Sequence, residues 1–257
     1  MTRAWRFAKL FLFSPTKAAE ACAKKEALAD GLKLYAVLSV AELLTSWFNP
    51  LAFLDPNAPM LPAHGAAFWL RVAMWEPVLF GLSVFFTVLV LDWMRSGWLP
   101  LKTAVATSWS SVPVILAIYY VYASPGTIAL GRGLAIAIFI VWAAPAILLA
   151  RRISAERWRK IAVFLLGLSA IQLTCLILEF ATVVPARSTF GFYALSFLTI
   201  GWMLVFVGVG LRKLCAMSTA RVVLGFLFAV IVSSAVPVLA YLLGLMPMEV
   251  LKVVLYV

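Results

Sequence analysis

Seven long apolar stretches constrain the fold of this chain more than any other feature of its sequence. They cover roughly residues 33–54, 70–94, 103–123, 132–150, 161–183, 190–211 and 221–243. A helix rises about 1.5 Å per residue, so about 20 residues cross a hydrocarbon core roughly 30 Å thick. We therefore predict an all-α, polytopic integral membrane bundle of about seven transmembrane helices.

The composition points to the same class. Of the 257 residues, 65% are hydrophobic and only 12% are charged, whereas about a quarter of an ordinary soluble domain is charged. So few charges cannot coat a water-soluble core. The composition excludes a soluble enzyme, a disordered regulator, a disulfide-stapled secreted module and a free nucleic-acid binder.

The basic residues behind the net charge of +11 are distributed unevenly between the two sides of the predicted bundle. With the N-terminus inside, 17 of the 21 Lys and Arg residues fall on the cytoplasmic side, and only Arg71, Arg132, Arg187 and Lys252 fall outside. An excess of Lys and Arg in cytoplasmic loops sets the orientation of membrane proteins. We predict an N-in, C-out, multi-pass protein of a cell membrane, the bacterial inner membrane by preference, with the lipid bilayer as partner and no nucleic acid.

Short connectors leave one membrane domain with two flanking segments. Residues 1–31 are predicted to form a cytoplasmic interfacial arm, 32–243 the transmembrane bundle, and 244–257 a short outer tail. The tail is apolar but too short to cross the bilayer. We expect it in the outer interface or as a helix that covers the bundle.

The arm begins with an amphipathic pattern over residues 2–13. Arg3, Arg6 and Lys9 fall on one side of a helix, and Trp5 falls among the apolar residues on the other. Such a helix lies in the membrane interface, with cations at lipid phosphates and aromatic rings at the acyl boundary. These four residues are therefore predicted to contact lipid.

A second helix is expected over residues 15–29. Ser14 would be its N-cap and Pro15 its first residue, a position that proline favours. A Glu20/Lys24 pair would support the helix, and Asp30-Gly31 would close it.

Glu42 is the acidic residue that lies deepest in a predicted span. Ser39, Glu42 and Ser46 are spaced three and four residues apart, so they share one helix face. A charged carboxylate at the bilayer centre costs about 3 kcal/mol or more. We expect Glu42 to be either protonated and hydrogen-bonded inside the bundle or ionised beside a water-filled cavity.

Further polar groups lie in other spans. Gln172 and Glu179 share one face of the fifth span, and Glu76 lies near the outer surface directly before a proline. With Glu42 they either line a pathway for a proton, ion or small polar solute, or hydrogen-bond the helices together. Asp92 is expected to pair with Arg95 at the inner boundary.

Packing between helices is the expected role of several other residues. Three tryptophans are placed deep in spans, and three glycines of the sixth span would let another backbone approach closely. They are Trp109, Trp142 and Trp202, and Gly201, Gly208 and Gly210.

Motifs for catalysis are missing from the sequence. His64 is the single histidine, so neither HExxH nor a His–Cys metal cluster is present. GxSxG, Walker A and GxGxxG are absent as well. We predict a protein that is not an enzyme, with no catalytic residue, no metal and no cofactor.

Three segments resemble bacterial members of the Yip1 family of polytopic membrane proteins. They are Phe13-Ser14-Pro15-Thr16-Lys17-Ala18-Ala19, then Ser108-Trp109-Ser110-Ser111-Val112-Pro113, and the closing stretch from Gly201-Trp202 to Met217-Ser218-Thr219-Ala220-Arg221. Members usually have about five spans, whereas two more, around residues 132–183, are predicted for this chain. The family is linked in eukaryotes to vesicle trafficking and small GTPases. It offers no catalytic residue to carry over.

Two functions follow as expectations. The first is a non-enzymatic Yip1-like scaffold or accessory subunit of a membrane complex, with partner membrane-protein subunits or further copies of itself. The alternative is a small secondary transporter or channel component with a polar pathway around Glu42.

Overall fold

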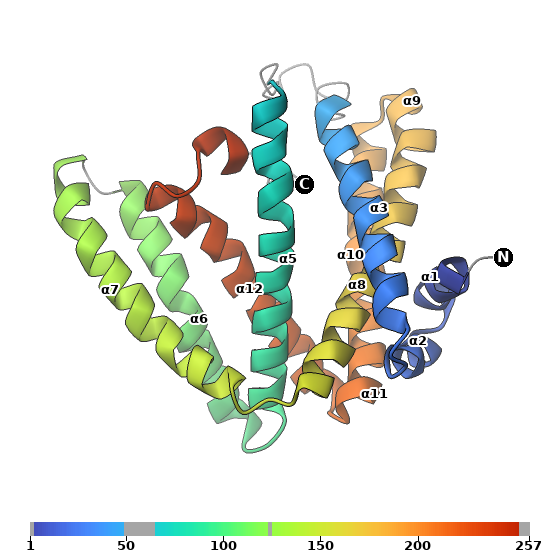
Figure 1. The fold of residues 1–257 in the computed structure, drawn as a ribbon, viewed down its shortest axis with the longest axis horizontal. Helices are drawn as coiled ribbons and strands as arrows, with labels where there is room; N and C mark the ends of the chain where they lie inside the picture. The colour runs from blue at the N-terminus through green and yellow to red at the C-terminus, as the bar shows by residue number, and fades with distance from the viewer. Residues whose placement is uncertain (1–2, 49–64, 123–124, 252–257) are drawn as a thin grey trace. The chain divides into compact units, whose positions relative to one another are not determined.

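The computed structural model describes residues 3–48, 65–122 and 125–251, and within these ranges it consists of helices and short connectors, without strands (Figure 1). The all-α prediction is confirmed for this part of the chain. The chain divides into two compact units. The described residues of Met1–Ala73 and Arg159–Thr219 form the first unit, and those of Met74–Trp158 and Ala220–Tyr256 form the second.

The helices of the first unit come from two stretches of the chain that are far apart in sequence. They are α1 (Arg3–Phe13), α2 (Pro15–Cys22), α3 (Ala27–Phe48), α8 (Ala155–Leu178), the π-helical η1 (Glu179–Val183), α9 (Val184–Ala186), α10 (Thr189–Phe206), the π-helical η2 (Val207–Leu211) and α11 (Arg212–Cys215). The first turn of α8 belongs to the second unit. That unit also contains most of α5 (Ala66–Met94), α6 (Leu99–Tyr122), α7 (Pro125–Ala150) and α12 (Thr219–Leu242).

Within the described residues, four helical segments are long and apolar enough to cross a membrane. They are Ala66–Met94, Ala155–Ala186, Thr189–Cys215 and Thr219–Tyr241, and they match the spans predicted over 70–94, 161–183, 190–211 and 221–243. The spans over 33–54, 103–123 and 132–150 stay predictions, as does the N-in, C-out orientation. Within α7, the segment Ile136–Ala150 is apolar but shorter than these four.

The prediction of a second helix over 15–29 is wrong in its end and in its pairing. The helix starts at Pro15 as predicted, but the side chain of Ser14 does not cap it, and it ends at Cys22. Glu20 pairs with Lys213 instead of Lys24. Asp30-Gly31 lies inside α3, because contacts with distant parts of the chain outweigh the local signals of a helix end.

The core of the second unit is built around paired tryptophans. Trp109 and Trp142 stack with ring centroids 4.7 Å apart, and the indole nitrogen of Trp142 donates to the carbonyl of Trp109 at 2.7 Å. Pro113 lies four residues after Trp109 and has no N–H for that carbonyl. The indole N–H therefore replaces the missing backbone hydrogen bond. The reverse bond, from Trp109 to the carbonyl of Trp142, is 3.2 Å long.

Basic side chains hold the end of α5. Arg221 donates to the carbonyls of Met94 and Gly97, each at 2.6 Å, and Lys102 donates to the carbonyl of Trp93 at 2.9 Å. A cation at a helix C-terminus satisfies carbonyls that lack an intrahelical partner and interacts well with the helix dipole. Some of the cations that predict orientation are therefore also helix caps.

The predicted ion pair of Asp92 with Arg95 is wrong. The carboxylate of Asp92 pairs with Arg157 at the start of α8, whereas Arg95 contacts Asp92 only through its backbone N–H. Packing of α5 against a helix distant in sequence brings Arg157 to the carboxylate, which sequence proximity did not indicate.

The chain turns back after α12. Gly244, with φ of +76°, allows the turn, and the N–H of Leu245 bonds to the carbonyl of Ala240 at 2.8 Å. Met246, Val250 and Leu251 are buried. The rest of the predicted outer tail lies outside the described residues, and its interfacial position stays a prediction.

Candidate functional site

The amphipathic helix α1 packs its apolar face against protein. Phe7, Ala8 and Phe11 are buried, and Phe11 is fully inaccessible to solvent. Its ring lies on Gly167 of α8, where an added Cβ would be 2.2 Å from a ring carbon. The ring centroids of Phe164 and Phe11 lie 5.4 Å apart. Gly167 is therefore a notch in α8 that receives Phe11.

Ion pairs hold the two ends of the arm. Arg3 donates to the carboxylates of Glu26 and Asp30, each at 2.8 Å, and Asp30 is buried. At α2, Lys213 pairs with Glu20. The hydrogen bond from Lys213 and its positive charge lower the pKa of Glu20 from its ordinary value.

Arg159 closes the C-terminal end of α2. Its guanidinium donates to the carbonyls of Ala23 and Lys24, each at 2.8 Å, which satisfies carbonyls at a helix end. Cys22, beside this cap, is fully buried. Burial raises the pKa of the Cys22 thiol to about 12.

The π-helical turn η2 supports the other side of the arm. An added Cβ at Gly210 would be 2.4 Å from the ring of Phe164 and 3.4 Å from the carbonyl oxygen of Pro15. The close approach predicted for Gly210 is confirmed. Gly208 is buried, but an added Cβ at Gly201 would meet nothing within 4 Å, so Gly201 makes no such contact within this chain.

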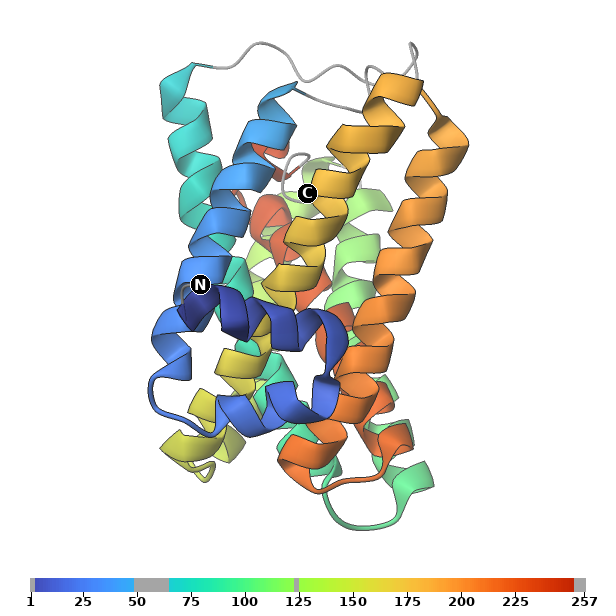
Figure 2. The same ribbon diagram turned by 90° about the vertical axis from the view of Figure 1, so that its right-hand side faces the viewer.

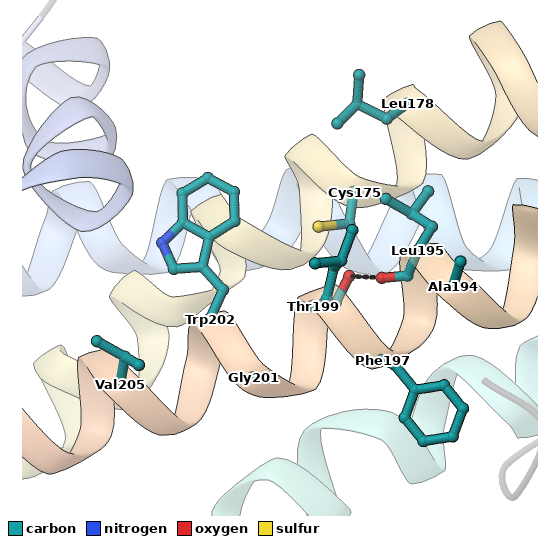
Figure 3. A pocket seen from close by; sticks show the side chains of 10 residues that line it. Cys175, Leu178, Ala194, Leu195, Phe197, Thr199, Gly201, Trp202 and Val205 are labelled. Carbon is teal, nitrogen blue, oxygen red and sulfur yellow. Dashed lines mark hydrogen bonds between the residues drawn. The ribbon is translucent and has the colours of Figure 1, made fainter.

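An apolar groove lies along α8 and α10, with a volume of about 740 Å³ (Figure 3). It is lined by Cys175, Leu178, Ala194, Leu195, Phe197, Leu198, Thr199, Gly201, Trp202 and Val205. The hydroxyl of Thr199 donates to the carbonyl of Leu195 at 2.8 Å, as the dashed line in Figure 3 shows. The groove therefore suits an apolar neighbour, and it offers no constellation of groups for chemistry. Trp202, predicted to pack between helices, lies on its wall.

The polar residues predicted to form a pathway are split between the units. Ser39 donates to the carbonyl of Tyr35 at 3.0 Å. Glu42, Gln172 and Glu179 are half-buried in the first unit. Glu76 is half-buried on α5 in the second unit. Ser46 lies in α3.

Glu42 and Glu179 lie on helices that ascend in the same direction (Figure 2). The helices meet at Gly31, where an added Cβ would be 3.0 Å from Leu166. Counted from this contact, Glu42 lies roughly 17 Å along α3, and Glu179, the first residue of η1, lies roughly 20 Å along the path of α8. By this count the backbones of Glu42 and Glu179 lie at a similar height above the contact.

The predicted lipid contacts divide into two groups. Arg3 pairs with protein carboxylates, whereas Arg6 and Lys9 are exposed and the side chain of Trp5 is 53% exposed. Contact of these residues with lipid stays a prediction. No group of three or more His, Cys, Asp and Glu residues that could hold a metal occurs in the described part of the chain. His64 lies outside it.

Residues that sequence reasoning missed are those that dock the arm. Gly167, Phe164 and Arg159 carry no local motif, and only their partners in α1 and α2 give them a role. An available signal was Gly167, which is the one glycine of the span predicted over 161–183.

In a comparison with known proteins, no protein family, no curated protein and no solved structure matches this chain.

Proposed function

We propose that this protein acts without chemistry of its own, as a scaffold or accessory subunit of a membrane complex, in the manner of the Yip1-like proteins that its sequence resembles. The four long apolar helices in the described part of the chain suit a multi-pass membrane protein. The proposed setting is the bacterial inner membrane, with the N-terminus inside, and the proposed partner is a transmembrane helix of another subunit.

The apolar groove is the observation that carries this proposal. The segment Thr189–Cys215, which contains α10, has only 28% of its most apolar window buried, against 61% for Ala155–Ala186. Ala194, Leu198, Gly201 and Val205 are spaced four, three and four residues apart and so share one face of α10. Small residues on such a face let a second backbone approach, and helices associate in membranes by such close packing.

Photo-crosslinking from the groove tests the proposal. A photoreactive amino acid in place of Phe197, which is 74% exposed, should give one discrete adduct in membranes. A Gly201→Leu substitution fills the groove and should abolish the adduct. The variant should still fold, because nothing lies within 4 Å of an added Cβ.

The matched control is Gly81→Leu on α5, where an added Cβ also meets nothing within 4 Å. It should leave the adduct unchanged. An adduct of twice the chain's mass would identify a second copy as the neighbour, and a different discrete mass would identify another subunit. Only lipid adducts, or an adduct that survives Gly201→Leu, would refute the scaffold proposal.

Transport is the second candidate, and it is favoured by the similar height of the Glu42 and Glu179 backbones in the first unit. Two half-buried carboxyl groups in membrane-spanning helices suit the binding of a proton or cation, because intramembrane acids commonly lie on such pathways. Glu42→Gln should then abolish proton or cation flux in proteoliposomes. Glu249→Gln, at an exposed position of the second unit, is the control. Absence of flux in the wild-type protein would refute this function.

A further inference from the structure

The exposed face of α1 combines two cations with two aromatic side chains. Arg6 and Lys9 are exposed, Trp5 is 53% exposed, and Phe13 is 69% exposed. At about 100° per residue these four side chains fall within an arc of about 100°. Trp5 therefore lies beside the cations, and its predicted place among the apolar residues of the opposite side is wrong. The buried side chains of Phe7 and Phe11 lie on the opposite side. One face of α1 therefore packs against the protein, and the exposed face carries both cations and aromatic rings.

The charge of this surface is positive after internal pairing. The acidic residues of the arm region described here, Glu20, Glu26 and Asp30, are all paired with Arg3 or Lys213. Arg6, Lys9, Lys17, Lys24 and Lys25 remain exposed. A partner of complementary charge is therefore anionic.

The position of α1 selects lipid as that partner. In the first unit, α1 runs across α3, α8 and α10 rather than along them (Figure 2). Phe11 meets α8 at Gly167, only six residues past the predicted inner end of that span, residue 161. On α3, Lys33 is exposed two residues after the contact of Gly31 with Leu166. The charge on Lys33 puts the edge of the hydrocarbon near this level.

We propose that Trp5, Arg6, Lys9 and Phe13 form a binding face for the anionic headgroups of inner-leaflet lipids. Arg6 and Lys9 contact the phosphates, while Trp5 and Phe13 enter the boundary of the acyl chains. The exposed aromatic rings give the reason to prefer a lipid over a soluble polyanion, since a membrane interface accommodates cations and apolar rings side by side. The inner edge of the bilayer then lies at the level of Gly167, and the arm covers the part of α8 that projects below it.

Lipid titration of the full-length protein tests this proposal. The purified protein in a zwitterionic detergent is titrated with short-chain phosphatidylglycerol or phosphatidylcholine, and bound lipid is counted by native mass spectrometry while tryptophan fluorescence follows thermal unfolding. Phosphatidylglycerol should bind saturably and raise the unfolding temperature. Arg6→Gln/Lys9→Gln should weaken that binding roughly thirtyfold, from about 1 kcal/mol per cation.

Two controls separate the explanations. Arg151→Gln/Arg152→Gln removes the same charge from exposed positions of the second unit and should leave binding unchanged. Trp5→Ser/Phe13→Ser should weaken binding of phosphatidylglycerol but not of glycerol phosphate. Three results would overturn the proposal. The two charge variants could weaken phosphatidylglycerol binding equally, or the two lipids could bind equally. Glycerol phosphate could also bind as tightly as phosphatidylglycerol. None of these results depends on the groove of α10.

Discussion

Truncation of Phe11 should release the arm from the first unit. Phe11 is fully buried between Phe164 and the notch at Gly167. Phe→Ala substitutions at such sites cost about 3–5 kcal/mol, because the side chain loses its contacts and leaves a cavity. Every 1.4 kcal/mol is a factor of about ten, so docking of the arm should weaken by roughly two to three and a half orders of magnitude.

Limited trypsin digestion measures the release. Lys24 and Lys25 are exposed in the connector between α2 and α3, and cleavage there requires the connector to leave its contacts with Arg159. Phe11→Ala should speed this cleavage strongly, and hydrogen exchange of α1 should rise in parallel. Phe13→Ala removes the same side chain from an exposed position and should have little effect. If both variants were cut at the wild-type rate, Phe11 would not hold the arm and the reasoning would fail.

Three more predictions follow from named contacts. Gly167→Ala should destabilise the protein by about 1–3 kcal/mol in denaturant unfolding, because the new Cβ overlaps the ring it faces, while Gly81→Ala, in open space, should not. Trp142→Phe should cost about 1–3 kcal/mol by removing the indole donor from the part-buried carbonyl of Trp109. The cost should be less in a Pro113→Ala background, which restores the backbone N–H, as a double-mutant cycle would reveal. Burial raises the pKa of the Cys22 thiol to about 12, so mass spectrometry should show that Cys22 resists alkylation at pH 8. Because this folded pKa lies above the ordinary value of 9.0, the contribution of Cys22 to stability should be complete below pH 9. It should be lost as the pH rises toward 12.

Local patterns predicted the arm only in part. The periodicity of residues 2–13 gave α1, and Pro15 gave the start of α2, because both depend on residues close in sequence. The end of α2 was missed, since Arg159 supplies its cap from a helix more than 130 residues away. The partner of Asp92 was missed for the same reason.

The candidate site shows the same division. Gly201 and Gly210 were both predicted to let another backbone approach, but only the structure distinguishes Gly201, open on the groove, from Gly210, which lies against Phe164. Spacing placed Glu42 on a polar face, but neither the half-burial of Glu42 nor its level relative to Glu179 follows from spacing within one helix.

Composition and periodicity by themselves determined that this is an all-α chain with helices fit to cross a membrane, because the length and apolarity of a segment decide whether it can do so. Tertiary structure decided which face of α1 is buried and which cations cap helices, and it revealed the groove along α10. These features join residues far apart in sequence, and the free energy of such contacts is set by shape and charge across helices rather than by any pattern along one of them.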